Sequence, residues 1–263
     1  MIFLKMAFRN VFRQKRRSLF TGLSIGGGFA LAAIFIGWAD GSYNGIIDQF
    51  TRTRLGHIQV HEKTYLDRPT LYKTVNDVAA IGAVLDRTKG VESWTPRVYS
   101  AGLAGAGDKS AGARIIGIDP EREARTTRFD RTIVEGRFFS GAQAREAVLG
   151  RGLADLLQAR PGDAIVLLSQ GADGSIAEDQ YTLVGVVSSG DEFIDRTAYY
   201  LPLAAAQEYL VLGERVHEIA VTVANLGRVM PVNRAIAAEI RDPDLAVEPW
   251  QVFAKSFFDA MKA

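Results

Sequence analysis

Several groups of side chains in this sequence have types and spacings that could support chemistry. The segment GLAGAGDKS, residues 102–110, has the glycines of a phosphate-binding loop, in which backbone N–H groups cradle a phosphate. That interpretation fails because Asp108 separates Gly107 from Lys109. A phosphate loop needs the lysine directly after the glycine, and an acid at this place repels a phosphate. The flanking alternation predicts a hairpin turn at residues 105–109 instead.

The three histidines could bind a metal ion or act as bases. His57 and His61 share one face of a predicted strand with Gln59, but the pattern offers no third ligand. We therefore expect half-exposed strand histidines rather than a metal site. His217 lies at the start of another predicted strand and has no nucleophile motif near it.

The acidic residues do not suggest an active site either. Glu178-Asp179 and Asp191-Glu192 are neighbouring acids in predicted loops, where we expect them to be solvated. The sequence lacks the G-x-S-x-G, H-E-x-x-H and EF-hand patterns. It also contains no cysteine, which excludes disulfides, thiol catalysis and cysteine metal sites. We expect no catalytic residues, no cofactor and no metal, and an enzyme is the least favoured class.

The element that dominates the organisation of the chain is an uncharged run near its amino end. Residues 18–39 comprise 22 positions without Asp, Glu, Lys, Arg or His. As a helix they would extend roughly 33 Å, enough to cross a hydrocarbon core of about 30 Å. Trp38 would lie at the far interface, where an amphipathic ring is favoured. The positive-inside rule assigns to the cytoplasm the basic residues that precede the run: Arg13, Lys15, Arg16 and Arg17.

Positive charge is concentrated at this end of the chain. Residues 1–17 contain six of the 31 basic residues and no acid, so the rest has a net charge of −5. Binding to nucleic acid needs basic charge on the folded body, so we expect no nucleic-acid partner. Residues 2–17 also have an amphipathic helical pattern, which suits a helix lying in the cytoplasmic membrane interface.

Three interpretations of the uncharged run are open: a retained anchor, a cleaved signal peptide and a buried helix of a soluble protein. The tripeptide at residues 37–39 could be a cleavage site, but the apolar region of a signal peptide is typically about 7–15 residues long. Small residues recur at every fourth position, a spacing that lets membrane helices approach closely: Ser18, Gly22, Gly26 and Ala30. We favour an anchor that packs against partner helices; alternatively, these glycines only loosen a lone anchor.

Beyond residue 40 the periodicity predicts a mixed domain. Helical character continues to residue 53, and residues 56–62 alternate as a strand. Asn76 can cap a following helix, and two strands complete a β-α-β-β opening. A strand-rich block follows, and residues 203–250 return to alternating helices and strands.

We therefore predict a membrane-anchored α+β protein. Residues 1–17 would form a cytoplasmic segment, residues 18–40 a transmembrane helix and residues 41–263 an extracytoplasmic domain. Within that domain, residues 54–128 and 203–250 would form one α/β unit, and residues 129–202 a β-rich unit inserted into it.

Six segments also follow one another in a characteristic order. The opening RNVFRQKRRSLFTGLSIGGGFAL is basic and then apolar, and GHIQVHEKTY follows at residues 56–65. RIIGIDPEREA, VEGRFF, AVLGRGLADLL and YLPLAAAQEYL come later. In order and spacing these segments resemble the MacB/FtsX-type ABC transporter permeases, most closely the lipoprotein-releasing (LolC/LolE-like) branch. The resemblance covers essentially the whole chain.

This resemblance implies one membrane helix and a periplasmic domain with a split, porter-like α/β subdomain and an inserted β-rich subdomain. It implies a non-catalytic permease subunit in the bacterial inner membrane, with its amino terminus in the cytoplasm. The implied partners are the membrane, an ABC ATPase subunit and a second permease subunit, identical or different. Family members have three more membrane helices, so we expect this chain to be the front part of a longer permease.

In the lipoprotein-releasing branch, the resemblance further implies a lipoprotein substrate and a periplasmic carrier, which one permease type grips with a hairpin. The matching segment, residues 169–179, is polar and lacks the prolines and aromatic residue expected of such a hairpin. We favour an ordinary loop there; its possible partner residues are Ser169, Gln170, Asp173, Ile176 and Asp179. Alternatives for the whole chain are a MacB-like efflux permease and a singly anchored or secreted periplasmic binding module.

Overall fold

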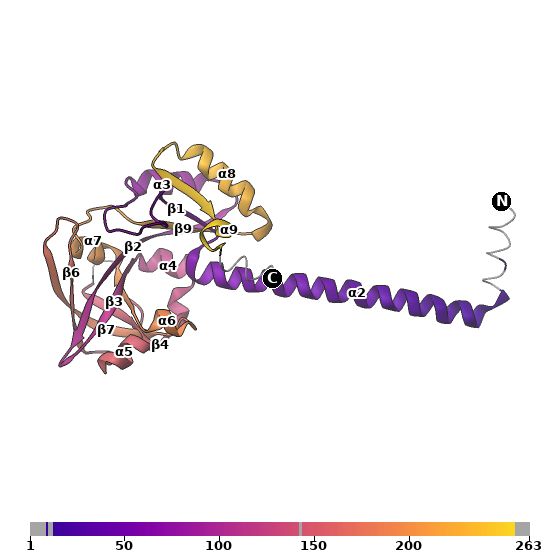
Figure 1. The fold of residues 1–263 in the computed structure, drawn as a ribbon, viewed down its shortest axis with the longest axis horizontal. Helices are drawn as coiled ribbons and strands as arrows, with labels where there is room; N and C mark the ends of the chain where they lie inside the picture. The colour runs from indigo at the N-terminus through magenta and orange to yellow at the C-terminus, as the bar shows by residue number, and fades with distance from the viewer. Residues whose placement is uncertain (1–8, 10–12, 142–143, 256–263) are drawn as a thin grey trace. The chain divides into compact units, whose positions relative to one another are not determined.

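The computed structural model describes residue 9 and residues 13–141 and 144–255, and the chain divides into two units, residues 1–49 and 50–263. The amphipathic helix predicted over residues 2–17 lies mostly outside the described residues. The first unit consists of helix α2 (Lys15–Phe50), whose last residue belongs to the second unit (Figure 1). The helix continues 12 residues beyond Trp38, which confirms that helical structure extends past the uncharged run.

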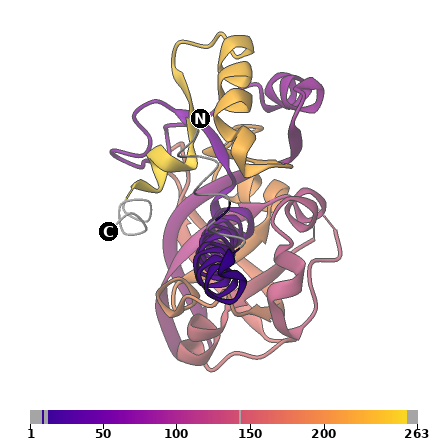
Figure 2. The same ribbon diagram turned by 90° about the vertical axis from the view of Figure 1, so that its right-hand side faces the viewer.

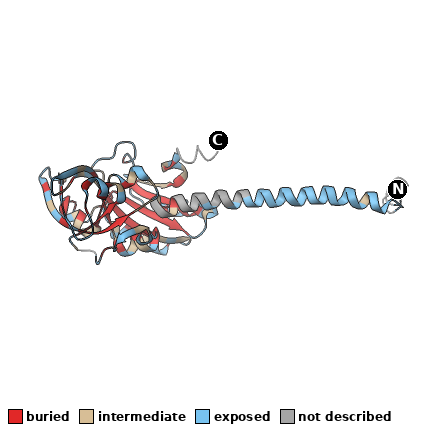
Figure 3. Cartoon of the chain, turned by 90° about the horizontal axis from the view of Figure 1, so that it is seen from below, coloured by how far each residue is buried: buried red, intermediate tan, exposed pale blue. Residues whose placement is uncertain are grey.

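Helix α2 has the length and composition of a membrane span. Its segment Lys15–Trp38 has 24 residues, a mean hydropathy of 2.0 and no residue buried within the chain, and the described residues contain no other such helix. Phe29, for example, is 77% exposed. Exposed apolar surface of this extent is unfavourable in water, so it needs lipid or other helices around it. The contrast with the buried strands is visible in Figure 3.

The second unit contains the remaining elements in the following order. Its first half comprises η1 (Thr51–Leu55), β1 (Ile58–Glu62), α3 (Val78–Arg87), β2 (Val91–Ala106), β3 (Lys109–Ile118), α4 (Pro120–Thr126), η2 (Phe129–Thr132), β4 (Ile133–Gly136), β5 (Glu146–Gly150) and α5 (Arg151–Leu157). Its second half comprises β6 (Ala164–Gln170), β7 (Ile176–Val187), α6 (Glu192–Asp195), β8 (Ala198–Pro202), α7 (Leu203–Tyr209), β9 (Glu218–Val223), η3 (Leu226–Arg228), α8 (Val229–Glu239), β10 (Leu245–Pro249) and α9 (Trp250–Phe253).

The strands of the described residues form one mixed, ten-stranded sheet. Its order is β10-β1-β9-β2-β3-β8-β5-β7-β4, and β6 pairs with both β2 and β7. The pairs β3–β8 and β5–β7 are parallel, and the other pairs are antiparallel. Because β6 joins β7 back to β2, the strands β2, β3, β8, β5, β7 and β6 close into a ring.

Strand β2 links the two halves of this sheet. Its first residues, Val91–Arg97, pair with β9, while Leu103–Gly105 pair with β6 and the whole second half pairs with β3. The α/β part and the strand-rich part therefore share β2 and β3. The division into subdomains at residues 129 and 202 stays a prediction.

Helices lie against this sheet at its two ends. Figure 1 shows α3 and α8 near β1 and β9 at one end, and α5 and α6 near β4 at the other. In Figure 2, α3 and α8 are neighbours, and Arg87 of α3 pairs with Glu239 of α8 at 2.7 Å. Gly82 of α3 faces the Trp94 ring so closely that a Cβ at this glycine would lie 2.3 Å from Cζ2. The glycine therefore allows the helix to approach β2.

The element order follows the sequence prediction closely, with one local correction. Strands β2 and β3 meet at a two-residue turn with Gly107 at φ 57°, so the predicted hairpin is confirmed. The prediction that Asn76 caps α3 is wrong. Residue Asp77 precedes the helix in the left-handed conformation, and its side chain makes no capping hydrogen bond. The preceding Val75 pairs with Val216, so the chain enters the helix through a turn at Asp77.

Candidate functional site

The carboxyl end of α2 leads into a hydrogen-bonded junction. Here η1 is a π-helix. This form is rare in proteins, and where it occurs it often lies at a functional site. The Gly56 N–H donates to the Thr51 carbonyl at 2.7 Å, and Gln59 Nε2 donates to the Leu55 carbonyl at 2.9 Å. Gly56 has φ 77°, and a Cβ there would lie 3.0 Å from the Val221 nitrogen, so glycine suits this close approach.

Arg52 extends the junction to two further strands. Its Nη1 lies 2.8 Å from Glu92 Oε2 on β2, and its Nη2 donates to the Val223 carbonyl of β9 at 3.3 Å. The last helical residues before β1 are therefore bonded to β1, β9 and β2. A displacement of η1 would move these bonds together.

A buried ion cluster lies on the same strands. Arg97 of β2 contacts Glu123 of α4 at 2.6 Å and Glu218 of β9 at 3.2 Å, and all three residues are buried. Arg97 and Glu218 are direct cross-strand partners. The Glu123 carboxylate also accepts hydrogen bonds from Thr95 at 2.9 Å and Thr127 at 2.8 Å. The cluster thus holds α4 against the sheet.

The pKa values in and beside this cluster are set by burial and by the neighbouring charges. Burial works to lower the pKa of Arg97, but the carboxylates of Glu123 and Glu218 outweigh it and the pKa is raised. Burial raises the pKa of Glu218 although Arg97 acts against it. Burial, aided by Glu218, also raises the pKa of Tyr99 to about 12. Both carboxylates are held by hydrogen bonds, as in a structural cluster rather than an acid–base pair.

The prediction that the histidines at positions 57 and 61 are half-exposed is wrong. His57 and His61 are both fully buried, because β1 lies between β9 and β10 and both of its faces are covered. His57 Nδ1 accepts a hydrogen bond from the Val223 N–H at 2.9 Å. His61 Nε2 lies 3.6 Å from Glu248 Oε2. Within the described residues, no group of three or more His, Asp or Glu side chains could hold a metal ion.

His217 is also fully buried and has two backbone partners. Its Nδ1 accepts from the Tyr99 N–H at 2.9 Å, so Nε2 carries the proton and donates to the Leu71 carbonyl at 3.2 Å. The Tyr65 ring stacks on the imidazole, with centroids 5.5 Å apart. Burial lowers the pKa of His217 to about 4. The neutral imidazole is therefore part of the folded structure at neutral pH.

The predicted membrane-side residues all lie on or next to α2. Trp38 is 70% exposed, and the basic residues Arg13, Lys15, Arg16 and Arg17 are exposed. A Cβ added at Gly22 or Gly26 would meet no atom within 4 Å. Nothing in the described chain therefore covers this part of the small-residue face formed by Ser18, Gly22, Gly26 and Ala30.

Residues 169–179 form a hairpin with a shorter loop than the sequence predicts. Ser169 and Gln170 belong to β6, Ile176 and Asp179 belong to β7, and only residues 171–175 connect the strands. Asp179 is paired with Arg145 at 2.5 Å. Asp173 lies in the turn and accepts hydrogen bonds from Ser175, which lower the pKa of Asp173.

The hairpin offers one exposed apolar side chain to a partner, since Ile176 is 81% exposed. We expect Ile176→Ser to change the free energy of unfolding by less than about 0.5 kcal/mol, because the side chain has little contact to lose. Chemical denaturation of the variant measures this. If the hairpin is an ordinary loop, transport in cells that express the variant will be unchanged. A stable variant with lost transport would instead identify Ile176 as a partner contact.

Sequence reasoning missed the ion cluster, and its expectation that the acid at residue 191 is solvated is wrong. Asp191 is half-buried, and its carboxylate accepts from the N–H groups of Phe193 and Ile194 at the start of α6. Glu178, expected in a solvated loop, is an exposed residue of strand β7. A signal for the cluster was present, since Arg97 interrupts a strand that is otherwise uncharged from Ser93 to Ala106.

Comparison with known proteins agrees with this architecture. The model of a family described as MacB-like periplasmic core domain matches residues 18–239. The periplasmic region of MacB from Actinobacillus actinomycetemcomitans has a TM-score of 0.54 and 16% identity, covering 77% of this chain and 92% of that one. The extracellular domain of the noncanonic ABC-type transporter YknZ from Gram-positive bacteria also has a TM-score of 0.54, with 12% identity, covering 73% of this chain and 98% of that one. At these identities the two structures establish only the fold of the mixed α/β domain, which follows the apolar helix in this chain.

Proposed function

This chain belongs to the family of MacB-like periplasmic core domains, and from that premise we propose that it acts as a permease subunit of an ABC transporter. An ATPase subunit would hydrolyse ATP in the cytoplasm, and this chain would carry the resulting motion to its extracytoplasmic domain. The observation that carries the proposal is the uninterrupted helix α2, which combines a 24-residue segment suited to cross a membrane with a continuation into η1.

The proposed orientation follows from charge. The basic residues before the uncharged run would remain in the cytoplasm near the ATPase, and the domain from residue 41 onward would face the periplasm of a bacterial inner membrane. At the far end, the hydrogen bonds of η1 and Arg52 would pass a displacement to β1, β2 and β9. In this role the chain binds its partner subunits and transmits motion, but it catalyses no reaction.

For the transported substrate, we propose a lipoprotein that is released from the membrane to a periplasmic carrier. The support is the sequence resemblance over the segments at residues 56–65, 114–124 and 147–157. Capture of the intact complex from native membranes tests the function. Co-purification of an ABC ATPase with a second permease subunit would support it, and absence of any ATPase would contradict it. A lipoprotein or a soluble carrier in the same sample would support the proposed substrate, whereas an efflux adaptor would contradict it.

We propose that the small-residue face of α2 packs against a helix of the second permease subunit. Gly26→Leu places a large side chain where close approach is needed. We expect about a tenfold fall in capture of the ATPase and the second permease, equivalent to about 1.4 kcal/mol. Quantitative pull-down from detergent-solubilised membranes, normalised to the amount of this chain, measures the effect.

Gly28→Leu is a matched control for this variant. Gly28 lies about 200° around the helix from Gly26, so the same substitution points away from the proposed contact. Neither glycine has an atom within 4 Å of an added Cβ, so the chain itself should tolerate both changes. Equal capture by Gly26→Leu and wild type would contradict the packing role.

A further inference from the structure

The second unit contains a cavity of about 270 Å³ beside the buried ion cluster. Strands β2, β3 and β8, together with η1, η2 and residues 189–194, contribute to its wall. Most of the lining is apolar, and it comes from Leu55, Ile116, Ile118, Phe129, Ile194 and Tyr200. The volume is just below the usual range for ligand sites, about 300–1,000 Å³, so it suits one narrow ligand.

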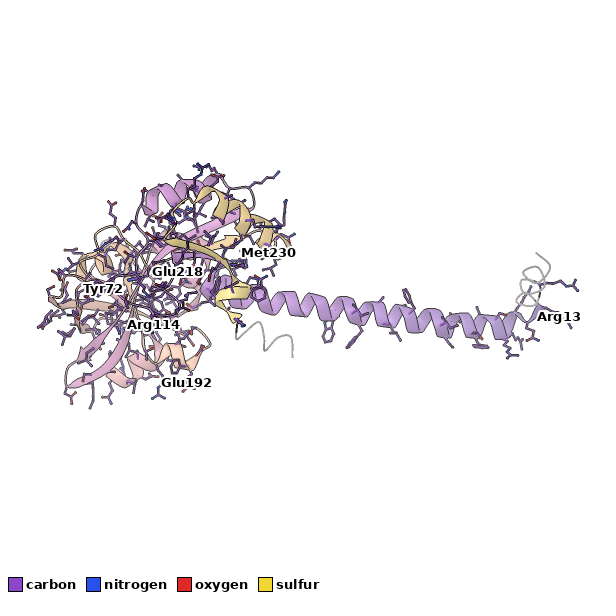
Figure 4. All side chains as sticks on the ribbon, turned by 45° about the horizontal axis from the view of Figure 1, so that its top comes forward. Arg13, Tyr72, Arg114, Glu192, Glu218 and Met230 are labelled. Carbon is purple, nitrogen blue, oxygen red and sulfur yellow. The ribbon has the colours of Figure 1, made fainter. Side chains whose placement is uncertain are left out.

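Among the described residues, the charged groups in the wall leave one cation available. Glu123 is held by Arg97, Thr95 and Thr127, and Asp191 accepts hydrogen bonds from the start of α6. Arg114 of β3 is exposed, and no carboxylate of the described residues lies within 4.0 Å of its guanidinium nitrogens. Figure 4 labels this residue on β3.

Arg114 also contacts an aromatic ring. Its guanidinium carbon lies 4.9 Å from the centroid of the Tyr99 ring, a cation–π contact. Tyr99 lines the same cavity. This contact with the ring face does not occupy the N–H donors of the guanidinium, and a planar fork of donors matches a carboxylate or a phosphate.

We propose that this cavity binds a single-chain amphiphile with an anionic head group, such as a fatty acid, with the chain against the apolar wall and the head group on Arg114. Burial of an aliphatic chain in such a wall is favourable because it removes apolar surface from water. A volume of this size favours one acyl chain over two, so we infer a single-chain ligand rather than a two-chain phospholipid. Phe193, which is 82% exposed, directly precedes the wall residue Ile194 in the sequence. The inference does not depend on the transport function.

Photochemical labelling of the full chain in lipid nanodiscs tests the proposal. The probe is a palmitate with a diazirine in its chain, and labelled peptides are identified by mass spectrometry after proteolysis. We expect labels on the peptides that contain Ile116, Ile118 and Phe129, and we expect excess unlabelled dodecanoate to reduce them. Label found only on α2 would overturn the proposal.

Two variants and two further probes sharpen this test. Arg114→Gln should reduce cavity labelling at least fivefold while labelling of α2 is unchanged, and Arg114→Lys should retain part of it. Arg125→Gln is the control, since Arg125 is exposed on α4 and does not line the cavity. A diazirine-bearing hexadecanol should label the cavity less than the acid does. Equal labelling by acid and alcohol, equal labelling of wild type and Arg114→Gln, or cavity labelling only by a diazirine-bearing phosphatidylglycerol would each overturn the proposal.

Discussion

Arg97→Met is expected to lower the free energy of unfolding by about 3–5 kcal/mol, the usual effect of removing one partner from a buried ion pair. The variant keeps an aliphatic side chain but leaves Glu123 and Glu218 without their shared cation. Both carboxylates are buried, at 3% and 6% exposure, so water cannot replace the guanidinium. Urea denaturation at neutral pH, monitored by tryptophan fluorescence, measures the loss.

Two controls separate burial from the loss of an arginine. Arg87 forms a similar 2.7 Å pair with Glu239, but the two side chains are 60% and 46% exposed. We expect Arg87→Met to cost no more than about 1 kcal/mol. Adding Glu123→Gln and Glu218→Gln to Arg97→Met should restore part of the lost stability, because the unpaired charges are then removed. Equal losses in the two methionine variants would contradict the structural role of the cluster.

Arg97→Lys should also be destabilising, although it keeps the positive charge. Arg97 uses Nε and Nη2 on the two oxygens of Glu123 and Nη1 on Glu218. A lysine ammonium cannot present this planar fork of donors to two carboxylates. The arginine therefore fixes the geometry between α4, β2 and β9 as well as the charge.

The sequence predicts the type and order of most elements because their periodicity survives in the fold. Residues 203–250, for which the sequence predicts alternating helices and strands, contain α7, β9, α8 and β10 in that order. The long apolar helix is equally clear, since 22 uncharged residues leave few other structures open. Turns are also predictable where they contain glycine, because glycine adopts positive φ values without steric cost. Gly107 and Gly162 both have positive φ.

Burial was harder to predict, because alternation shows which residues share a face but not whether that face is covered. Gln59 and His61 alternate with Ile58 and Val60, which predicts that one face of the strand is exposed to solvent. All four side chains are nevertheless buried. The reason is tertiary, since β1 has strands on both sides and covered faces. The same applies to Glu218, whose strand β9 is buried at every position.

The candidate binding cavity could not be predicted from sequence. Its wall joins residues from η1, β3, η2 and β8, which are as far apart in the sequence as Leu55 and Tyr200, and only the tertiary fold brings them together. Arg114 alone resembles any exposed strand arginine. Its available guanidinium becomes apparent only once the neighbouring carboxylates are seen to have other partners.

Acidification from pH 6.5 to pH 4 is expected to destabilise the fold through His217, by on the order of 3 kcal/mol at full effect. Burial holds the pKa of His217 at about 4, against 6.5 for an unperturbed histidine. Above pH 6.5 the imidazole is neutral in the folded and in the unfolded chain, so its contribution to the free energy of unfolding is fully present. As the pH falls below 6.5 the unfolded chain takes up a proton that the folded chain resists, so stability is lost until the folded imidazole also titrates near pH 4.

Protonation would also break a specific contact, because His217 Nδ1 accepts from the Tyr99 N–H and cannot do so once it carries a proton. His217→Gln isolates this contribution, since it removes the titrating group and can keep a donor and an acceptor. The pH dependence of the free energy of unfolding is compared for the two proteins. Glu218, whose pKa is raised, changes stability in the opposite direction as the pH falls, but it is present in both proteins and cancels in the difference. The difference in free energy of unfolding between wild type and His217→Gln should shrink as the pH falls from 6.5 to 4. If the two proteins instead give parallel curves, His217 does not resist protonation in the folded state.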